Sequence, residues 1–253
     1  MKLFDSHAHY CDERYRENIE QIINEIKELG NISIINAATS VESSKIVIEQ
    51  AMRYDFMYAT VGIHPEEIMG NIDLKEIKKL AKNNKVVAIG EIGLDYHYDT
   101  DKEKQKALFK SQIELANDIG LPIVIHNRES SKDLLDILKN EINANKRGVF
   151  HCCEMNFELI KEALKLDYYI SFAGPVTFKN AKKAKDIIEY VPIEKMLIET
   201  DSPYLAPDPL RGTINTSKNI KIIAQKVAEF KEIAIEEVAE ITYNNTKKVF
   251  NIL

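Results

Sequence analysis

The chain alternates short apolar runs with longer segments of helical periodicity, and this alternation recurs along its whole length. The runs are rich in β-branched residues and read, in order, LFDSHAH, ISIINAA, MYATVGIH, VVAIGEIG, PIVIHN, GVFHCC, YYISFAG and KMLIETD. After the first run, Ile19, Ile22, Ile23 and Ile26 recur at the spacing of one helix face. Eight strand–helix units predict a parallel sheet, and eight such units close into a (β/α)8 barrel, also called a TIM barrel.

No linker or low-complexity segment divides the 253 residues, a length that one barrel of this kind fills. We therefore expect residues 1–253 to form a single barrel domain. An open, doubly wound sheet is the alternative, but it would need a glycine-rich nucleotide loop after its first strand, where the sequence has none. A capping box made by Thr100 and Glu103 is expected to start the helix over residues 102–118.

Charge and cysteine content narrow the classes of function. The formal net charge is -6, which excludes a strongly basic nucleic-acid footprint, so nucleic-acid contacts would need a local patch. The sequence has no 18-residue apolar run and no signal-peptide core. Three cysteines, two of them adjacent, favour a reducing compartment over a disulfide framework. We expect a cytoplasmic protein that contacts no membrane and acts as a monomer without an obligatory protein partner.

Polar residues gather at the C-terminal ends of the predicted strands. His7 and His9 belong to the first strand, where residues i and i+2 point the same way about 6.5 Å apart, so both imidazoles can reach one ion. The C-terminal face of a barrel is where active sites are built, so the polar groups of all strands should meet there. The further members of this set are His64, Glu91, Asp95, His126, Arg128, Glu129, His151, Glu199 and Asp201.

Six of these side chains form a set of nitrogen and oxygen ligands: His7, His9, Glu91, His126, His151 and Asp201. Such a set suits two divalent ions of the zinc, manganese or magnesium type. Glu91 can bridge two ions with its two oxygens, and Asp201 is the candidate base for the proton of the attacking water. These two carboxylates are the predicted catalytic residues. A barrel with a purely structural metal is the non-enzymatic alternative, and it does not account for open, oxygen-rich coordination.

The motifs of this chain resemble those of the TatD-type metal-dependent hydrolases, within the amidohydrolase-like barrels. The matching stretches occur in the family's order: DSHAH, GIHPEE, AIGEIGLDYH, PIVIHNRES, FHCC, SFAGPVTFKN, LIETDSPYLAP and NNTKKVF. The resemblance is to the branch with paired histidines. It implies a deoxyribonuclease that cleaves phosphodiester bonds with metal-activated water. It also implies that His7, His9 and Asp201 hold one ion, that His126 and His151 hold the second, and that Glu91 bridges them.

Contacts to the substrate, expected to be DNA, are predicted from His64, Arg128, Lys179 and Arg211, which follow strand ends. The family's basic loop PxRGKRNEP reads PLRGTINTS here and its FHCFSG reads FHCCEM, so both loops depart from the pattern. Two alternative functions remain. One is a small-molecule amide or lactone hydrolase of the amidohydrolase type, although such sites often bridge their ions with a carbamylated lysine where this chain has Glu91. The other is a D-aminoacyl-tRNA deacylase.

Overall fold

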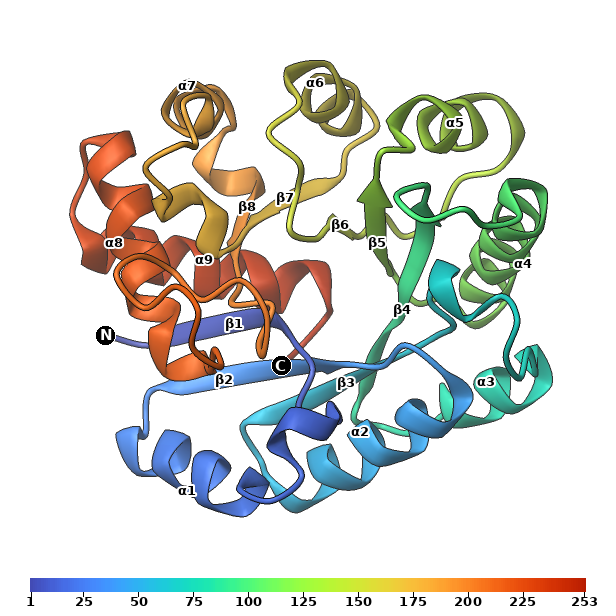
Figure 1. Cartoon of the computed structure of the whole chain (residues 1–253), viewed down its shortest axis with the longest axis horizontal. Helices are drawn as coiled ribbons and strands as arrows, with labels where there is room; N and C mark the ends of the chain where they lie inside the picture. The colour runs from blue at the N-terminus through green and yellow to red at the C-terminus, as the bar shows by residue number, and fades with distance from the viewer.

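The computed structural model describes all 253 residues, and its centre is a barrel of eight parallel strands (Figure 1). Each strand pairs with the next one along the chain. The strands are β1 (Leu3–Ala8), β2 (Ile32–Ala37), β3 (Met57–Val61), β4 (Val86–Asp95), β5 (Ile123–Arg128), β6 (Val149–Phe150), β7 (Tyr169–Phe172) and β8 (Met196–Ile198). The predicted (β/α)8 barrel is confirmed.

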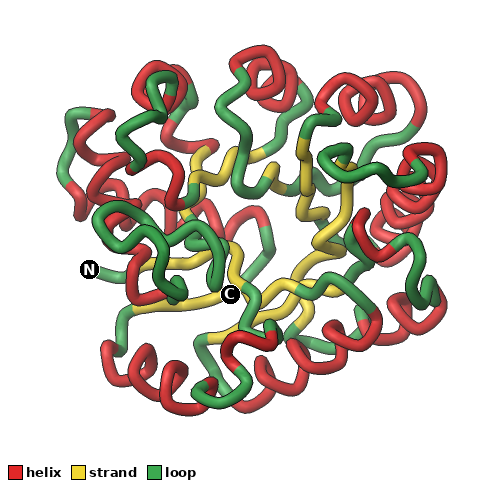
Figure 2. Tube along the Cα trace, in the orientation of Figure 1, coloured by secondary structure: helices red, strands yellow, loops and turns green.

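The helices form a ring outside the strands (Figure 2). They are α1 (Ile19–Leu29), α2 (Val41–Arg53), α3 (Leu74–Leu80), α4 (Lys102–Ile119), α5 (Ser131–Asp136), α6 (Phe157–Lys165), α7 (Ala184–Tyr190), α8 (Ile220–Lys231) and α9 (Ile235–Val249). No helix combines the length and the apolar character that a membrane crossing requires.

The strands are apolar on both faces because both faces are covered, as in other all-parallel sheets. Their outer faces pack against the helices in one large apolar core. Their inner faces form a second, smaller cluster near the N-terminal ends of the strands. This inner cluster contains Phe4, Ile35, Val87, Ala88, Val124, Val149, Tyr169 and Leu197, and Phe250 from the C-terminal end of the chain packs on it. The base of the barrel is therefore filled, and its open end lies at the opposite side.

The seam between β1 and β8 closes only at its C-terminal end. A single parallel bridge joins Ala8 to Ser202. Beside it, the Asp201 amide donates to the carbonyl of His7 at 3.0 Å, and the His9 amide donates to the carbonyl of Ser202 at 2.6 Å. The predicted neighbourhood of the first and last strands is thus confirmed, and the seam lies directly beside His7, His9 and Asp201.

Strand β6 spans two residues and β8 three, shorter than their apolar runs in the sequence. Backbone hydrogen bonds to the neighbouring strand continue one residue past the C-terminal end of each of these two strands. The His151 amide donates to the carbonyl of Ile125, and the Glu199 amide donates to that of Phe172. The regular pairing ends where the side chains turn polar. The chain is therefore held by single backbone bonds at the positions where it enters the candidate site.

The predicted capping box at the start of α4 is wrong by one residue. Asp101 is the N-cap, and its side chain accepts from the Lys104 amide at 3.1 Å. The Thr100 hydroxyl instead accepts from the side chain of Gln105 at 2.8 Å. An aspartate is as good an N-cap as a threonine, so the sequence offered two adjacent candidates.

Candidate metal centre

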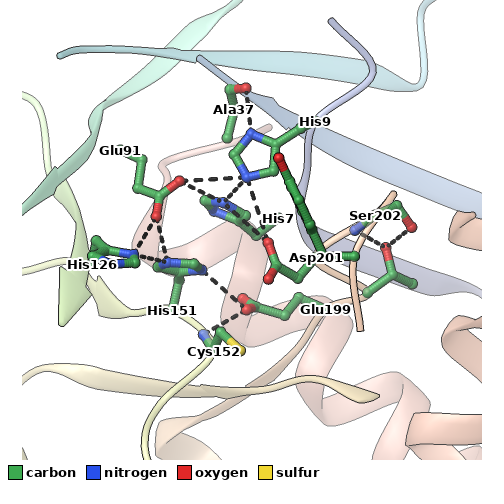
Figure 3. A network of polar contacts seen from close by, with 12 residues as sticks. His7, His9, Ala37, Glu91, His126, His151, Cys152, Glu199, Asp201 and Ser202 are labelled. Carbon is green, nitrogen blue, oxygen red and sulfur yellow. Dashed lines mark hydrogen bonds and ion pairs between the residues drawn. The ribbon is translucent and has the colours of Figure 1, made fainter. Parts of the chain in front are cut away.

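The two-residue period of the strands sets polar side chains directly above the apolar base of the barrel. His126 comes two residues after Val124, and Glu199 comes two residues after Leu197, so each faces the barrel axis one layer nearer the C-terminal end. The same relation holds for His151, which follows β6 and comes two residues after Val149. Figure 3 shows these side chains converging from different strands on one point.

Glu91 stands between two pairs of histidines (Figure 3). Its Oε2 lies 3.3 Å from Nε2 of His7 and 3.4 Å from Nε2 of His9. Its Oε1 lies 2.7 Å from Nδ1 of His126 and 2.7 Å from Nε2 of His151. Nε2 of His64 lies 3.4 Å from Oε1 as well, so one carboxylate faces five imidazole nitrogens, two at Oε2 and three at Oε1. Its two oxygens thus reach both histidine pairs, which is the arrangement expected of a bridging ligand.

Asp201 completes the group around the first pair. Its Oδ1 lies 3.5 Å from Nε2 of His9 and 3.9 Å from Nε2 of His7. Burial alone would raise the pKa of Asp201, but the hydrogen bond with His9 and the nearby imidazoles lower it, so the side chain is a carboxylate at neutral pH. Asp201 is therefore available as an anionic ligand or as a proton acceptor.

The donor set fits divalent cations. The Nε2 atoms of His7 and His9 are only 3.0 Å apart, and the Nδ1 of His126 is 3.3 Å from the Nε2 of His151. Buried imidazole nitrogens that face one another share at most one proton, so the facing lone pairs need a cation. Ligand atoms of His7, His9 and Asp201 lie within 4.8 Å of one another, as do those of His7, Glu91 and His151. Nitrogen and oxygen donors without sulfur suit zinc, manganese or magnesium.

Three of the four histidines also have a partner on the ring nitrogen that points away from the centre. Nδ1 of His9 lies 3.0 Å from the carbonyl oxygen of Ala37. Nε2 of His126 lies 2.8 Å from Oδ2 of Asp95, and Nδ1 of His151 lies 3.3 Å from Oε1 of Glu199. Such outer partners set which nitrogen of a histidine carries the proton and which one is free to bind metal.

Comparison with known proteins agrees with this geometry. Residues 4–251 match the family described as TatD related DNase. The chain belongs to the TatD family. It is 43% identical over 253 residues to the "Uncharacterized metal-dependent hydrolase YabD" of Bacillus subtilis, covering 99% of each chain. It is 33% identical to the protein of Escherichia coli K12 named "Uncharacterized metal-dependent hydrolase YcfH", covering 100% of this chain and 97% of the other.

Solved structures of TatD-family proteins have the same fold. The crystal structure of YJJV, a TatD homologue from E. coli K12, superposes with a TM-score of 0.93 at 28% identity, covering 99% of this chain and 98% of that one. A TatD-family hydrolase from Entamoeba histolytica gives a TM-score of 0.87 at 25% identity, with the same coverage. The family resemblance predicted from the motifs is confirmed.

In this TatD-family chain the centre opens into a cavity of about 980 Å³. Arg128 is the one lysine or arginine among its lining residues. Apart from the groups of the centre, the lining is acidic, and its outer carboxylates are Asp12, Glu13, Glu66, Glu67 and Glu154. The cavity is therefore electronegative until cations occupy it. Glu66 and Glu67 belong to the GIHPEE stretch, but nothing in the sequence placed them or the other outer carboxylates at this cavity.

Of the four predicted substrate-binding residues, two line this cavity. Nε2 of His64 lies 3.4 Å from Oε1 of Glu91, and the Arg128 guanidinium lies 5.8 Å from the ring centre of Tyr98. Lys179 and Arg211 are not among the lining residues, and the Arg211 guanidinium lies 4.2 Å from the ring centre of Phe178 instead. Substrate contact by these four residues stays a prediction.

Asp95 and Glu199 are the site residues that sequence reasoning left without a role. Both are buried, with exposed fractions of 2% and 0%. A signal was present, because Glu199 precedes Asp201 by two residues and Asp95 ends the GEIGLD run after Glu91. Buried carboxylates need a partner, and the outer nitrogens of His126 and His151 are those partners here.

Zinc should bind the metal-free protein more tightly as pH rises towards 9. Burial opposes protonation of His126, but Asp95 and Glu91 raise its pKa from 6.5 to about 9. Because Nδ1 must lose its proton to bind metal, protons compete with zinc below that pH. A chelator-competition titration at several pH values between 6.5 and 9 measures the trend, and His126→Gln should flatten it. An affinity that stays constant over this range would contradict the prediction.

The stability of the metal-free protein should change in the opposite direction. The pKa of His126 is higher in the folded state, about 9, than its ordinary value of 6.5. Its pairing with Asp95 and Glu91 therefore stabilises the fold fully below pH 6.5, and this contribution is lost as pH rises through about 9. Urea unfolding of metal-free protein at the same pH values, compared with His126→Gln, measures this contribution.

Proposed function

We propose that this metal-dependent hydrolase of the TatD family cleaves phosphodiester bonds of DNA at a two-ion centre. The observation that carries the proposal is the position of Glu91, which faces two histidine pairs with its two oxygens at the floor of an open cavity. The description of the matching family as TatD related DNase supports the choice of substrate. Paired divalent ions suit in-line displacement at phosphorus, because they stabilise the attacking and the leaving oxygen.

The chain offers ligands for each ion. His7, His9 and Asp201 would hold one ion. His126 and His151 would hold the other, with Glu91 between the two. When bound, the ions lower the pKa of a water molecule towards neutrality and offset the charge that develops on the phosphate oxygens.

The protein's own groups then bind and orient the substrate. Asp201 Oδ1, on the open side of the first histidine pair, accepts the proton of the attacking water. Arg128, at the end of β5, donates to a non-bridging phosphate oxygen, where a guanidinium supplies two parallel hydrogen bonds. His64 lines the cavity, and its Nδ1 accepts from the Glu66 amide, so Nε2–H is the group that would donate to an oxygen of the same phosphate.

The acidic lining limits how much of a nucleic acid the cavity binds. Carboxylates around the mouth repel phosphates beyond the one that the ions and Arg128 hold. We therefore expect short or single-stranded segments to enter more readily than a duplex, whose phosphates are denser. The cavity lining contains only one lysine or arginine, Arg128. This scarcity of basic side chains also favours the alternative, a hydrolase of small amides or lactones, so the test includes both substrate classes.

The test compares substrates on metal-loaded protein. Protein reconstituted with zinc or manganese is incubated with single-stranded DNA, duplex DNA, RNA, D-aminoacyl-tRNA and a panel of lactones and amides. Cleavage of DNA that stops on chelation is the expected result. Metal-dependent turnover of lactones or amides without any phosphodiester cleavage would favour the alternative, and deacylation of D-aminoacyl-tRNA alone would favour the third function.

Replacement of Arg128 tests the substrate assignment more sharply. Binding of single strands weakens with salt by a slope of about −0.7 per phosphate contact, so Arg128→Gln should reduce the slope by about 0.7. Arg53→Gln is the matched control, because Arg53 ends α2 and pairs with Glu49 far from the cavity lining. Fluorescence anisotropy with labelled oligonucleotide measures both slopes. If the salt dependence of binding had the same slope in both variants, Arg128 would not contact a phosphate.

A further inference from the structure

The two candidate ion positions differ in how their carboxylates are arranged. The first has a carboxylate, Asp201, directly beside its histidine pair. The second has no carboxylate of its own apart from the shared Glu91. It has instead a buried carboxylate behind each histidine, Asp95 behind His126 and Glu199 behind His151.

Asp95 is held rigidly for this contact. Its amide donates to Oε1 of Gln105 at 2.9 Å, and Nε2 of Gln105 donates to its carbonyl at 2.8 Å. Its Oδ1 accepts from the His97 amide at 2.9 Å, which leaves Oδ2 to face Nε2 of His126 at 2.8 Å. Since both the backbone and one carboxylate oxygen are fixed, the remaining oxygen is aimed at the histidine ring.

Glu199 is held in a comparable way from the other side of the barrel. Its Oε1 accepts from the Cys152 amide at 2.5 Å and faces Nδ1 of His151 at 3.3 Å (Figure 3). The side chain is completely buried, and its Oε2 has no hydrogen-bond partner. No lysine or arginine pairs with it, so a buried negative charge at this place needs a positive charge nearby.

The contacts of the first pair are different. Nδ1 of His9 faces a neutral carbonyl, that of Ala37, and Nδ1 of His7 has neither a hydrogen bond nor a carboxylate partner. Nδ1 of His151 also makes no hydrogen bond, but it lies within ion-pair distance of Glu199 Oε1, at 3.3 Å. The negative charge for the first ion therefore comes from Asp201 directly. For the second ion, negative charge must act through the imidazole rings of His126 and His151. A carboxylate next to the ring nitrogen that points away from the centre makes the other ring nitrogen, which would bind metal, more basic.

We propose that Asp95 and Glu199 are positioning residues for the second ion: they fix the rings of His126 and His151, select the metal-binding nitrogen, and supply the negative charge that Asp201 supplies for the first ion. This inference rests on the proposed two-ion centre. It does not depend on which bond the enzyme hydrolyses.

The test measures metal binding in two crossed backgrounds. His9→Ala disables the first position and leaves the second, whereas His126→Ala does the reverse. Asp95→Asn or Glu199→Gln, added to His9→Ala, should weaken zinc binding by about 10–100-fold, the usual effect of losing such a partner. Glu199→Gln added to His126→Ala should leave the remaining zinc affinity unchanged. Glu154→Gln is the matched control, because Glu154 lines the same cavity but bonds to Asn127, Ser131 and the Glu129 amide.

A spectroscopic readout separates positioning from a merely structural role. Cobalt bound in the His9→Ala background reports ligand geometry through its visible absorption, and Glu199→Gln should shift that band while circular dichroism stays normal. If Glu199→Gln does not fold, Asp95→Asn alone decides the question.

The inference is overturned if both variants bind zinc as tightly as their parent, or if they weaken both backgrounds equally. A metal content that never exceeds one ion per wild-type chain would instead overturn the two-ion centre. Asp95 and Glu199 would then still be tested, because their variants must weaken a single ion held by His126 and His151 and must leave unchanged one held by His7, His9 and Asp201.

Discussion

Asp201→Asn should lower kcat by at least about 100-fold at saturating metal, because losing a general base typically costs about 10²–10⁴-fold. The amide has the same shape but neither the charge nor the basic oxygen. Asparagine also tolerates the positive φ of 54° at this position, so the backbone can stay as it is. Steady-state kinetics with excess zinc or manganese measure the effect, and circular dichroism checks the fold.

Asp12→Asn is the control for this experiment. Asp12 lines the same cavity, but its carboxylate pairs with Arg14 and with the Tyr204 hydroxyl. Only its backbone amide contacts a histidine of the centre, by donating to the His9 carbonyl at 3.1 Å, and the substitution keeps that amide. Its variant should keep activity within a few-fold. If Asp201→Asn also stayed within a few-fold of wild type, Asp201 would not be the base, and its part in the centre would be limited to binding metal.

Glu91→Gln should lower the free energy of unfolding of the metal-free protein by about 3–5 kcal/mol at neutral pH, the usual cost of removing one partner of a buried ion pair. Burial alone would raise the pKa of Glu91, but His151, His64 and His126 hold it well below its ordinary value. The variant leaves the positive charges of His126 and His151, whose pKa values are raised, without this partner. The loss should shrink as pH rises through about 9, where His126 releases its proton.

Urea unfolding after exhaustive chelation measures this loss. Glu66→Gln is the matched control, because Glu66 has a side chain 44% exposed and lies 3.9 Å from His64. A surface substitution of this kind changes stability by less than about 0.5 kcal/mol. A loss below about 1 kcal/mol in Glu91→Gln would mean that the histidines are neutral in the metal-free protein, in conflict with the raised pKa of His126.

The barrel and the group of six candidate ligands could be predicted because both depend on local pattern. Parallel strands show as apolar runs, and a polar residue at the end of such a run faces the same rim as those of the other strands. His7, Glu91 and Asp201 lie far apart in the sequence, yet their place at strand ends was enough to bring them together.

The remainder of the site depends on contacts that no local pattern specifies. The acidic lining comes from residues that connect strands to helices, such as Glu13 and Glu67 in short 3-10 helices and Glu154 in a loop. The course of these connections is set by packing between elements. The same reason explains Arg211, which follows a strand end in the sequence but lies over Phe178 and not in the cavity lining. The proposed roles of Asp95 and Glu199 depend on how the rings of His126 and His151 are oriented. Only the three-dimensional structure shows these orientations.

The seam between β1 and β8 has a consequence for how the protein is made in the cell. His7 and His9 leave the ribosome first, and Asp201 follows almost 200 residues later. At ordinary translation rates of about 5–20 residues per second, the pair waits on the order of 10–40 s for its partner. The first ion position is therefore completed only when the barrel is nearly synthesised. An ion at this candidate position would therefore enter at the end of folding, and a nascent chain that stalls before β8 has no complete first position.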